Sequence, residues 1–488
     1  MSLFFLLNKV ISIFFPIFAA QNLTHTMKYY LLPLGCQMNQ SDTGRVRTVL
    51  HRMGFVPTDN EDEATILGVI ACSVRQKGID KVYGRIEKWN AMKNRQNVIT
   101  FVSGCILPAD RVRFLKLFDL VFPMNELPNF PDMIRQYGIV TPASLKMGEE
   151  IPYQPVVQPQ MPLFNKHDKV NPSANMEPFW AITPCQASTF EAFIPIQNGC
   201  NKFCTYCAVP YTRGREVSRP SEDILAELKN LVERDYKRIT LLGQNVNSYG
   251  LDKNGEEINF AELLRRVGEY GKTSGKEFWV YFTSPHPRDM TDEVIEVIAQ
   301  YDCLAKQIHI PIQSGDDVML QRMNRHHNME TYRHIIQTIR RVLPTATIFT
   351  DIIVGFTHES EDEFENTRKA MEEFKYNMAY IAQYSVREGA VASGWDDDIT
   401  KEVKRERYHR LTDELMKHSL VYNESLVGTT VKMLVEDHDR KSGYLNGHTE
   451  GKIVIRFASD DESLIGQIVK VKVTAATPLS IEGELELG

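Results

Sequence analysis

The chain has 488 residues, of which 43% are hydrophobic and 24% are charged, and its formal net charge is −7. This composition excludes a disordered or fibrous protein, and the length predicts about three globular domains. The negative balance does not indicate a nucleic-acid partner, so any RNA contact would need a local basic face. Eight cysteines in so long a chain favour a reducing compartment over a disulfide framework, and we expect a cytoplasmic protein.

Residues 1–26 contrast with the rest of the chain. Leu3 to Phe18 is almost wholly apolar, with Lys9 as its only charge. The run resembles the apolar part of a signal peptide and is too short for a comfortable membrane-spanning helix. Because nothing before Met27 carries a motif, we interpret residues 1–26 as a mis-called leader and Met27 as the true start. A genuine membrane tether is the alternative.

Three cysteines in residues 27–136, the predicted first domain, each follow an apolar run. Cys36, Cys72 and Cys105 come after Tyr29–Leu34, Ile66–Ile70 and Val98–Val102. Their separations of 36 and 33 residues match βαβ units, with helices expected at Thr43–Met53 and Lys77–Ala91. The carboxyl ends of parallel strands share one edge of a sheet, so the three thiols should converge there.

Two interpretations of this triplet are open. Free cysteine is often simply buried, which would make the three thiols core residues. However, Gly35, Ala71 and Gly104 precede them, and small residues at strand ends favour a close turn of the backbone. Three thiolates can hold a four-iron cluster with one iron left open, and that iron could carry an exogenous sulfur atom.

Residues 137–191 form a predicted linker, because prolines are frequent there and no periodicity is visible. These prolines include Pro152, Pro155, Pro159, Pro162 and Pro172. Cys185 has no motif partner in this linker, so we interpret it as a free thiol.

A second triplet, Cys200, Cys204 and Cys207, has the spacing Cys-x3-Cys-x2-Cys and follows the strand-like run Ala192–Ile196. Such a loop folds three thiolates around one cubane iron–sulfur cluster, which normally takes four, so one iron keeps an open site. A zinc site is the alternative. It needs four nitrogen or sulfur ligands, and neither a second knuckle nor a nearby His follows.

Strands and helices alternate through residues 192–425, which we predict to be an α/β domain. The expected strands are Ala192–Ile196, Arg238–Leu242, Phe278–Phe282, Gln307–Ile310, Ile348–Val354 and Met378–Tyr384. Helices such as Ile224–Arg234 and Glu361–Phe374 lie between them, and Ser360 with Glu363 predicts a capping box. Six such units predict a partial (β/α)6 barrel with its site at the carboxyl ends of the strands.

Polar side chains gather after three of these strands. They are Gln244 and Asn245 after the second, Ser284 and His286 after the third, and Gln313, Ser314 and Gly315 after the fourth. Amides and hydroxyls can hold a polar ligand without adding charge. Loop capping is the alternative, since Asn, Ser and Gly favour turns anyway. We assign His286 no proton-transfer role, and we assign Cys303 to the core.

Residues 426–488 change to short alternating runs: Thr430–Val435, Lys452–Phe457, Gln467–Val473 and Ile481–Leu487. Strands of this length predict a small five-stranded β-barrel. After Val431 there are 7 Lys and Arg against 10 Asp and Glu. Charge therefore leaves RNA binding and a structural cap equally open.

Several of these segments resemble known signatures. Cys200 to Cys207, with Tyr206 before the last cysteine, resembles the Cys-x3-Cys-x-aromatic-Cys loop of the radical S-adenosylmethionine (SAM) enzymes. Four runs resemble the methylthiotransferases, most closely the MiaB type: Leu34–Asn39, Cys72–Arg75, Thr205–Gly214 and Val217–Pro220. The resemblance covers Met27 to Leu487, nearly the whole chain.

The resemblance implies a SAM-chelating four-iron cluster on Cys200, Cys204 and Cys207 and an auxiliary, sulfur-carrying four-iron cluster on Cys36, Cys72 and Cys105. It implies SAM contacts from Tyr206, Gln244, Asn245, Ser284, His286, Gln313, Ser314 and Gly315. Thiolates would act as ligands and not as acids or bases.

The MiaB type adds a methylthio group to C2 of N6-isopentenyladenosine, the tRNA base 3′ of the anticodon. Its C-terminal TRAM domain grips tRNA, and Gly443–Gly447 aligns with the glycine-rich turn of that domain. The implied partners of a monomer are the tRNA anticodon stem-loop, a sulfur donor, and a low-potential electron donor such as a flavodoxin or ferredoxin.

Three alternatives stand beside this expectation: relatives acting on N6-threonylcarbamoyladenosine, relatives acting on an aspartate of a ribosomal protein, and a non-catalytic iron–sulfur RNA-binding protein. The Gly-Cys-Gln-Met-Asn run at residues 35–39 favours the MiaB type. Thr357–Ser360 replaces the usual Pro-Gly-Glu-Thr, and Arg387–Ala390 replaces Arg-Pro-Gly-Thr. The resemblance therefore does not predict the geometry of these two loops.

Overall fold

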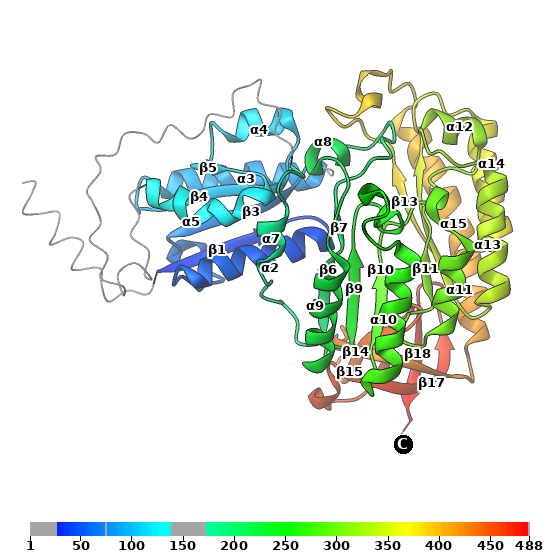
Figure 1. The fold of residues 1–488 in the computed structure, drawn as a ribbon. Helices are drawn as coiled ribbons and strands as arrows, with labels where there is room; N and C mark the ends of the chain where they lie inside the picture. Colours follow the sequence, from blue (N-terminus) through cyan, green and yellow to red (C-terminus); the bar gives the residue numbers. More distant parts are fainter. Residues whose placement is uncertain (1–26, 74–75, 138–171, 487–488) are drawn as a thin grey trace, which may run out of the picture.

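The computed structural model describes residues 27–73, 76–137 and 172–486. Figure 1 shows three parts: a sheet domain in blue and cyan, a larger partial barrel in green and yellow, and a small closed barrel in red. The expected leader, residues 1–26, lies outside the described residues, as do Val74 and Arg75. In the described ranges, no helix has both the length and the hydropathy that a bilayer-spanning segment needs.

The N-terminal domain is built on a five-stranded parallel sheet. Its strands are β1 (Lys28–Pro33), β2 (Val56–Pro57), β3 (Ile66–Cys72), β4 (Ile99–Cys105) and β5 (Leu120–Val121), in the order β2-β1-β3-β4-β5. Every residue of β3 and β4 is buried, as expected of central parallel strands that are covered on both faces. The three apolar runs predicted as strands are confirmed, and β3 and β4 end on Cys72 and Cys105.

Helices pack around this sheet (Figure 1). They are α2 (Gln37–Arg52), α3 (Gln76–Met92), α4 (Pro108–Phe114) and α5 (Phe130–Gln136). Alternate side chains of β3 and β4 enter two separate cores: Ile66 and Phe101 belong to one, and Val69 and Val102 to the other. Helix α2 begins earlier than the predicted Thr43, because the residues before Thr43 that it buries include the polar Asn39, Ser41 and Asp42, which hydrophobic periodicity does not detect.

The described part of the predicted linker returns to the N-terminal domain. Its short helix α7 (Glu177–Trp180) places Phe179 and Trp180 in the same core as residues of α2 and α5. The backbone N–H of Cys185 donates to the carbonyl of Gly44 in α2 at 3.0 Å, and Cys185 is a free thiol as predicted. Of the prolines named above, Pro152, Pro155, Pro159 and Pro162 lie outside the described residues.

The structure confirms the predicted partial barrel. Its strands are β6 (Glu191–Pro195), β9 (Arg238–Leu242), β10 (Trp279–Phe282), β11 (Gln307–His309), β12 (Thr347–Val354) and β13 (Met378–Gln383). They form two three-stranded parallel sheets, β10-β9-β6 and β11-β12-β13, which a bridge between Val280 and Leu304 brings together.

Helices surround the outside of this barrel (Figure 1). They are α9 (Ser221–Glu233), α10 (Phe260–Ser274), α11 (Asp292–Gln300), α13 (Met329–Val342), α14 (Glu361–Phe374) and α15 (Lys401–Ser425). The short elements are β7 (Gln197–Asn198), α8 (Val209–Arg213), β8 (Val217–Ser218) and α12 (Asp317–Arg322). Helix α14 carries the predicted capping box of Ser360 and Glu363, and Cys303 packs, partly buried, against the core.

The C-terminal part is a closed five-stranded barrel, as predicted. Its strands are β14 (Thr430–His438), β15 (Tyr444–Thr449), β16 (Val454–Ala458), β17 (Ile468–Ala476) and β18 (Ser480–Leu485), in the order β14-β15-β16-β18-β17.

Of the expected glycine-rich turn at Gly443–Gly447, only Gly443 lies in a turn, because β15 begins at Tyr444. Only Gly443, at φ 76°, has a left-handed backbone, and Gly447 lies inside β15 opposite Val435. A Cβ on Gly447 would lie 1.9 Å from the carbonyl oxygen of Leu434. The glycine therefore serves a close approach of two strands beside a register shift, and not a turn.

The closed C-terminal barrel packs against the partial barrel, at the end where the strands of the partial barrel begin (Figure 1). Arg238, the first residue of β9, donates to Glu436 of β14 at 2.5 Å. The hydroxyl of Tyr281 donates to the carbonyl of Glu450 at 2.8 Å, and the hydroxyl of Thr347 donates to the carbonyl of Gly451 at 2.7 Å. The C-terminal barrel therefore does not cover the carboxyl ends of these strands, where the active sites of such barrels lie.

Candidate active site

The first cysteine triplet meets at one edge of the N-terminal sheet. Cys72 and Cys105 end β3 and β4 and are register partners. A Cβ on Gly35, whose φ is +119°, would lie 2.7 Å from Cys72 Cβ and 3.2 Å from Cys72 Sγ, which places Cys36 beside Cys72. Cys36 is exposed, whereas the other two thiols are buried. The predicted convergence is therefore present.

Asn39 in the first turn of α2 organises this edge. Its side-chain N–H groups donate to the carbonyls of Leu34 and Ala71, both at 2.7 Å. Its amide oxygen accepts from Arg213 at 3.0 Å and lies 3.6 Å from the sulfur of Cys105. One amide thus ties together the ends of two strands and a residue of the barrel.

Arg213 was not assigned a role from the sequence, although it lies in a run that carries the family resemblance. Its Nε donates to the sulfur of Cys105 at 2.9 Å, and its Nη2 donates to Asp42 at 2.6 Å. Burial by itself would lower the pKa of Arg213, but the charges of Asp42 and Cys105 outweigh it and raise that pKa. The guanidinium is therefore a permanent buried cation beside this triplet.

The second triplet lies in a loop whose beginning is held by several backbone contacts. Gly199 has φ +84°, and a Cβ there would lie 2.0 Å from the carbonyl oxygen of Arg215. Its N–H donates to the side chain of Gln244 at 2.5 Å. The N–H of Cys200 donates to the carbonyl of Gly214 at 3.1 Å. Gln244, predicted to bind SAM, thus helps to hold the loop itself.

A second buried arginine reaches this loop. Arg325 donates to the sulfur of Cys204 at 3.5 Å and to the hydroxyl of Tyr206 at 3.4 Å. Its other terminal nitrogen donates to the carbonyl of Pro311 at 2.9 Å. Sequence reasoning missed Arg325, because no local pattern distinguishes a buried arginine in a loop from an exposed one.

Burial raises the pKa of three thiols, Cys105, Cys200 and Cys207, to about 12 in each case. Such thiols ionise only when a cation compensates the charge, which is what bound iron supplies. Among the described residues, no three His, Cys, Asp or Glu side chains are grouped as around a single metal ion. The thiolates of a four-iron cluster can lie farther apart than the ligands of a single ion, because each thiolate binds a different iron. The chemistry of both triplets therefore fits such clusters.

Asn245 belongs to a buried polar network beside the second triplet. Its side-chain N–H group donates to Asp289 at 3.0 Å and to Glu216 at 3.3 Å. Asp289 also pairs with Lys202 at 2.5 Å. Since Lys202 lies between the first two cysteines of the loop, the network stabilises the loop from outside.

His286 is held through its backbone. Its N–H and carbonyl exchange hydrogen bonds with the side chain of Asn247, both at 2.8 Å, and its Nδ1 accepts from the N–H of Arg288 at 3.1 Å. Burial, with a further contribution from Arg325, lowers the pKa of His286 well below its usual range. His286 is therefore a neutral imidazole, and its lack of a proton-transfer role stays a prediction. Ser284 precedes it with a left-handed backbone at φ 57°.

In the third predicted polar cluster, Gln313, Ser314 and Gly315 make contacts with neighbouring elements of the barrel. Gln313 has φ +69°, and its backbone pairs with β12. The hydroxyl of Thr367 in α14 lies 3.2 Å from that of Ser314 and accepts from the N–H of Gly315 at 2.9 Å. These contacts turn Ser314 and Gly315 toward α14, and SAM binding by the cluster stays a prediction.

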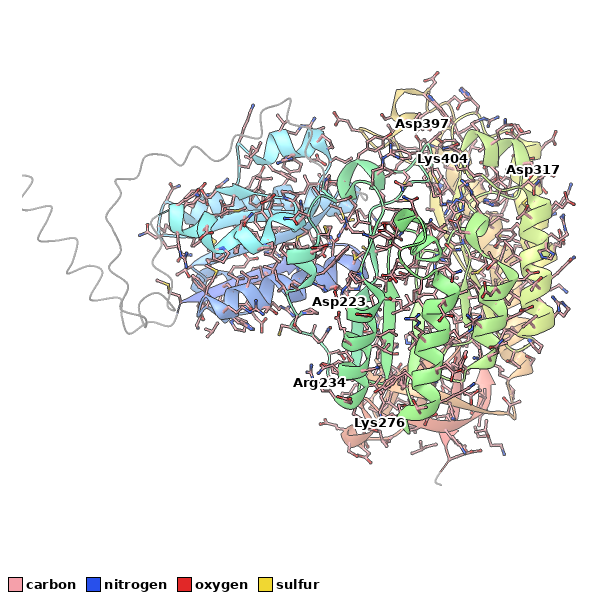
Figure 2. The ribbon with its side chains drawn as sticks, viewed as in Figure 1. Asp223, Arg234, Lys276, Asp317, Asp397 and Lys404 are labelled. Atoms are coloured by element: carbon pink, nitrogen blue, oxygen red, sulfur yellow. The ribbon has the colours of Figure 1, made fainter. Side chains whose placement is uncertain are left out.

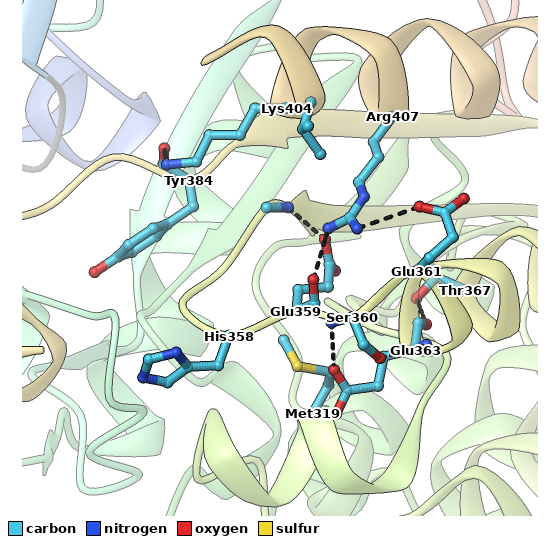
Figure 3. Close-up of polar contacts among 12 residues, drawn as sticks. Met319, His358, Glu359, Ser360, Glu361, Glu363, Thr367, Tyr384, Lys404 and Arg407 are labelled. Atoms are coloured by element: carbon cyan, nitrogen blue, oxygen red, sulfur yellow. Dashed lines mark hydrogen bonds and ion pairs between the residues drawn. The ribbon is translucent and has the colours of Figure 1, made fainter. Parts of the chain in front are cut away.

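The loop at Thr357–Ser360 keeps a defined geometry despite its unusual sequence (Figure 3). Glu359 accepts from the N–H of Gly355 at 2.6 Å and from Arg407 of α15 at 2.8 Å. His358 has φ +58° where the family pattern has glycine. Its N–H and ring donate to Asp398 at 2.8 and 2.9 Å, which compensates for the strained backbone.

The second divergent loop, Arg387–Ala390, bridges the two domains. Glu388 lies 3.8 Å from Arg113 of α4, and a Cβ on Gly389 would lie 3.5 Å from Leu107. Burial lowers the pKa of Arg387, and the nearby charge of Cys72 opposes this shift. Further along the chain, Lys404 of α15 pairs with Asp397 at 2.5 Å, at the upper end of the barrel in Figure 2.

Three family models match this chain. The model of the radical SAM superfamily matches residues 194–371. The model described as "Uncharacterized protein family UPF0004" matches residues 28–122, and that of the TRAM domain matches residues 424–485. Each match falls largely within one of the three parts of the fold, and the radical SAM match ends at residue 371, before β13.

Curated relatives extend over nearly the whole chain. A Clostridium botulinum protein named tRNA-2-methylthio-N(6)-dimethylallyladenosine synthase is 35% identical over 464 residues, covering 94% of this chain and 96% of its own. A Clostridium perfringens protein of the same name is 35% identical over 460 residues, covering 92% and 96%.

Among solved structures, the radical SAM methyltransferase TsrM from Kitasatospora setae aligns with a TM-score of 0.50 and 12% identity, over 73% of each chain. This likeness concerns the fold alone.

Proposed function

Because the chain belongs to the MiaB family of radical SAM methylthiotransferases, we propose that its substrate is N6-isopentenyladenosine next to the anticodon of tRNA, methylthiolated at C2. The observation that supports methylthiotransfer is the pair of cysteine triplets, one at the carboxyl edge of the N-terminal sheet and one in the loop that follows β6 and β7, each contacted by a buried arginine. The names of the curated relatives support the choice of tRNA base.

The radical SAM domain implies a four-iron cluster and SAM. We assign this cluster to Cys200, Cys204 and Cys207 and an auxiliary four-iron cluster to Cys36, Cys72 and Cys105. When bound, the first would supply the electron that cleaves SAM, and the second would supply the sulfur. Three thiolates leave one coordination position open at each site, for the amino and carboxylate groups of SAM at the first.

In this scheme, the side chains around the second triplet hold the cysteine loop and would bind SAM. Arg325 donates to Cys204 and Tyr206 and places a buried positive charge where the thiolates concentrate negative charge. His286 is neutral and offers hydrogen bonding without charge. We retain Gln244, Asn245, Ser284, Gln313, Ser314 and Gly315 as proposed SAM-site residues; their contacts described above hold the loops of this site.

The run at residues 35–39 supports the isopentenyl substrate over the threonylcarbamoyl one, and the TRAM match supports tRNA as the partner of residues 424–485. We further propose that a low-potential donor of the flavodoxin or ferredoxin type reduces the protein, that a separate donor renews the sulfur, and that the protein is a cytoplasmic monomer.

Two single substitutions separate the roles of the triplets. Cys204→Ala should abolish formation of 5′-deoxyadenosine, because two thiolates cannot hold the SAM-chelating cluster. Cys72→Ala should leave 5′-deoxyadenosine formation but abolish the methylthio product, because only the sulfur carrier is lost. Both products are measured under dithionite with isopentenylated tRNA, and threonylcarbamoylated tRNA serves as the competing substrate.

Cys303→Ala is the matched control, since Cys303 lies outside both triplets and should keep both products. Methylthio product from Cys72→Ala, or 5′-deoxyadenosine from Cys204→Ala, would contradict the assignment of the two clusters. Methylthiolation of the threonylcarbamoylated tRNA alone would contradict the proposed substrate and leave the cluster roles intact.

A further inference from the structure

Arg213 belongs to the barrel, but its side chain makes its main contacts in the N-terminal domain. It is the last residue of α8, and its guanidinium donates to Cys105 at 2.9 Å, to Asn39 at 3.0 Å and to Asp42 at 2.6 Å. The side chains of Arg213 and Asp42 are only 5% and 1% exposed. The rigid fork of a guanidinium suits such a set of acceptors.

The backbone around Arg213 is fixed as well. Its carbonyl accepts from the side chain of Asn198 at 2.9 Å and from the hydroxyl of Ser173 at 2.8 Å. Helix α8 begins at Val209, directly after the loop that ends in Cys207. One short helix therefore joins a cysteine of the second triplet to the residue that contacts Cys105 of the first.

We propose that Arg213 is a positioning residue that tunes the auxiliary cluster through Cys105 and fixes that cluster relative to the SAM-cleaving site. This inference rests on the auxiliary cluster of the proposed function. A thiolate that accepts a hydrogen bond from a cation transfers less negative charge to iron, which makes the cluster easier to reduce. Asp42 acts in the opposite sense, because it takes up part of the positive charge of Arg213.

A purely structural ion pair between α8 and α2 is the competing explanation. In that case the loss of either partner would loosen the same interface and act on the cluster in the same direction. If Arg213 tunes the cluster, the two losses act in opposite directions: without Arg213 the sulfur loses its donor, and without Asp42 the guanidinium acts on the sulfur more strongly.

The experiment uses the full chain with Cys200, Cys204 and Cys207 all replaced by Ala, so that only the auxiliary cluster can assemble from iron and sulfide. In this parent we compare Arg213→Met, Asp42→Asn and Arg219→Met. Arg219 is the matched control, a buried arginine that pairs with Glu227 at 2.5 Å. The readouts are the reduction potential by EPR-monitored titration and the rate of iron loss to a chelator.

Arg213→Met should shift the potential to more negative values and accelerate iron loss several-fold. Asp42→Asn should shift the potential to less negative values, and Arg219→Met should leave it unchanged. A potential of Arg213→Met equal to that of the parent overturns the inference, and so does a shift of the same sign in Arg213→Met and Asp42→Asn.

If Arg213→Met assembles no cluster, Arg213→Lys provides the test, because it keeps the charge without the fork and should give an intermediate negative shift. No shift with lysine would overturn the inference. A parent that binds no cluster contradicts the auxiliary cluster of the proposed function itself. A parent that binds one, with Arg213→Met unchanged, contradicts only the role of Arg213.

Discussion

Each cysteine triplet has a buried arginine aimed at one of its sulfur atoms. Arg213 contacts Cys105 and Arg325 contacts Cys204, and both guanidinium groups are buried. An isolated buried cation is costly, so it needs acceptors nearby. Thiols supply them only weakly until they ionise on binding metal. Arg213 also has a charged partner in Asp42, and in the proposed function both arginines would lie beside the negative charge of the cluster thiolates.

His358 permits a test at the same scale. Its backbone is left-handed at φ +58°, which costs a residue with a Cβ about 1–2 kcal/mol. His358→Gly relieves this cost and loses an exposed pair with Asp398 worth at most about 1 kcal/mol, so the free energy of unfolding should change little. His358→Val should lose about 1–2 kcal/mol, since a β-branched residue tolerates this conformation worst.

Denaturant midpoints measure both variants of His358. A glycine variant clearly less stable than the valine variant would contradict the argument, because it would mean that the contact with Asp398, and not the backbone, decides the stability of this loop.

At the scale of elements, α14 packs closely on the loop after β11. A Cβ on Gly315 would lie 2.7 Å from Thr367 Cα and 2.8 Å from Ala370 Cβ. Gly315→Ala should therefore push α14 outward and cost about 1–3 kcal/mol, in the range of other overpacked cores. Thermal unfolding, followed by the circular dichroism of the helices, measures this loss.

Gly84 in α3 provides the matched control for Gly315, because nothing lies within 4 Å of a Cβ built there. Gly84→Ala should stabilise the protein by about 0.5–1 kcal/mol through the lower entropy of the unfolded chain. Equal effects of the two alanine variants would show that α14 can move aside.

At the scale of the whole molecule, the C-terminal barrel is attached through buried charge. Burial by itself would raise the pKa of Glu436, but hydrogen bonds from His448 and Arg238 outweigh it and lower that pKa to about 2. A carboxylate with a lowered pKa stabilises the folded state fully above its unfolded pKa of about 4.5. This contribution is lost as the pH falls from about 4.5 toward 2.

Glu436→Gln should therefore lower the free energy of unfolding by about 3 kcal/mol near pH 7, and its difference from the unmodified protein should shrink as the pH falls below about 4.5. Urea denaturation at a series of pH values measures this difference. Glu484→Gln, on the exposed side of β18, is the control and should show a small difference throughout. A constant difference for Glu436→Gln down to pH 3 would contradict the lowered pKa.

The sequence by itself determined the features that depend on neighbouring residues. The two cysteine triplets, the strands before them and the capping box of Ser360 and Glu363 were predicted, because spacing, periodicity and capping are local. The convergence of Cys36, Cys72 and Cys105 also followed, since parallel strands bring their carboxyl ends to one edge. The five-stranded C-terminal barrel was predicted, although only four of its strands were identified.

Only the tertiary structure decided which side chains face these sites. Arg213 reaches Cys105 across a domain boundary, Ser314 and Gly315 turn toward α14, and Gly447 lies in a strand instead of a turn. None of these has a local signature. In the sequence, a buried arginine cannot be told from an exposed one, and a glycine that packs under a helix or lies in a strand cannot be told from a glycine in a turn. The role of each of these residues depends on which distant element packs against it. Helices and sheets pack so as to bury whole apolar faces, and this packing is not visible in a local stretch of sequence.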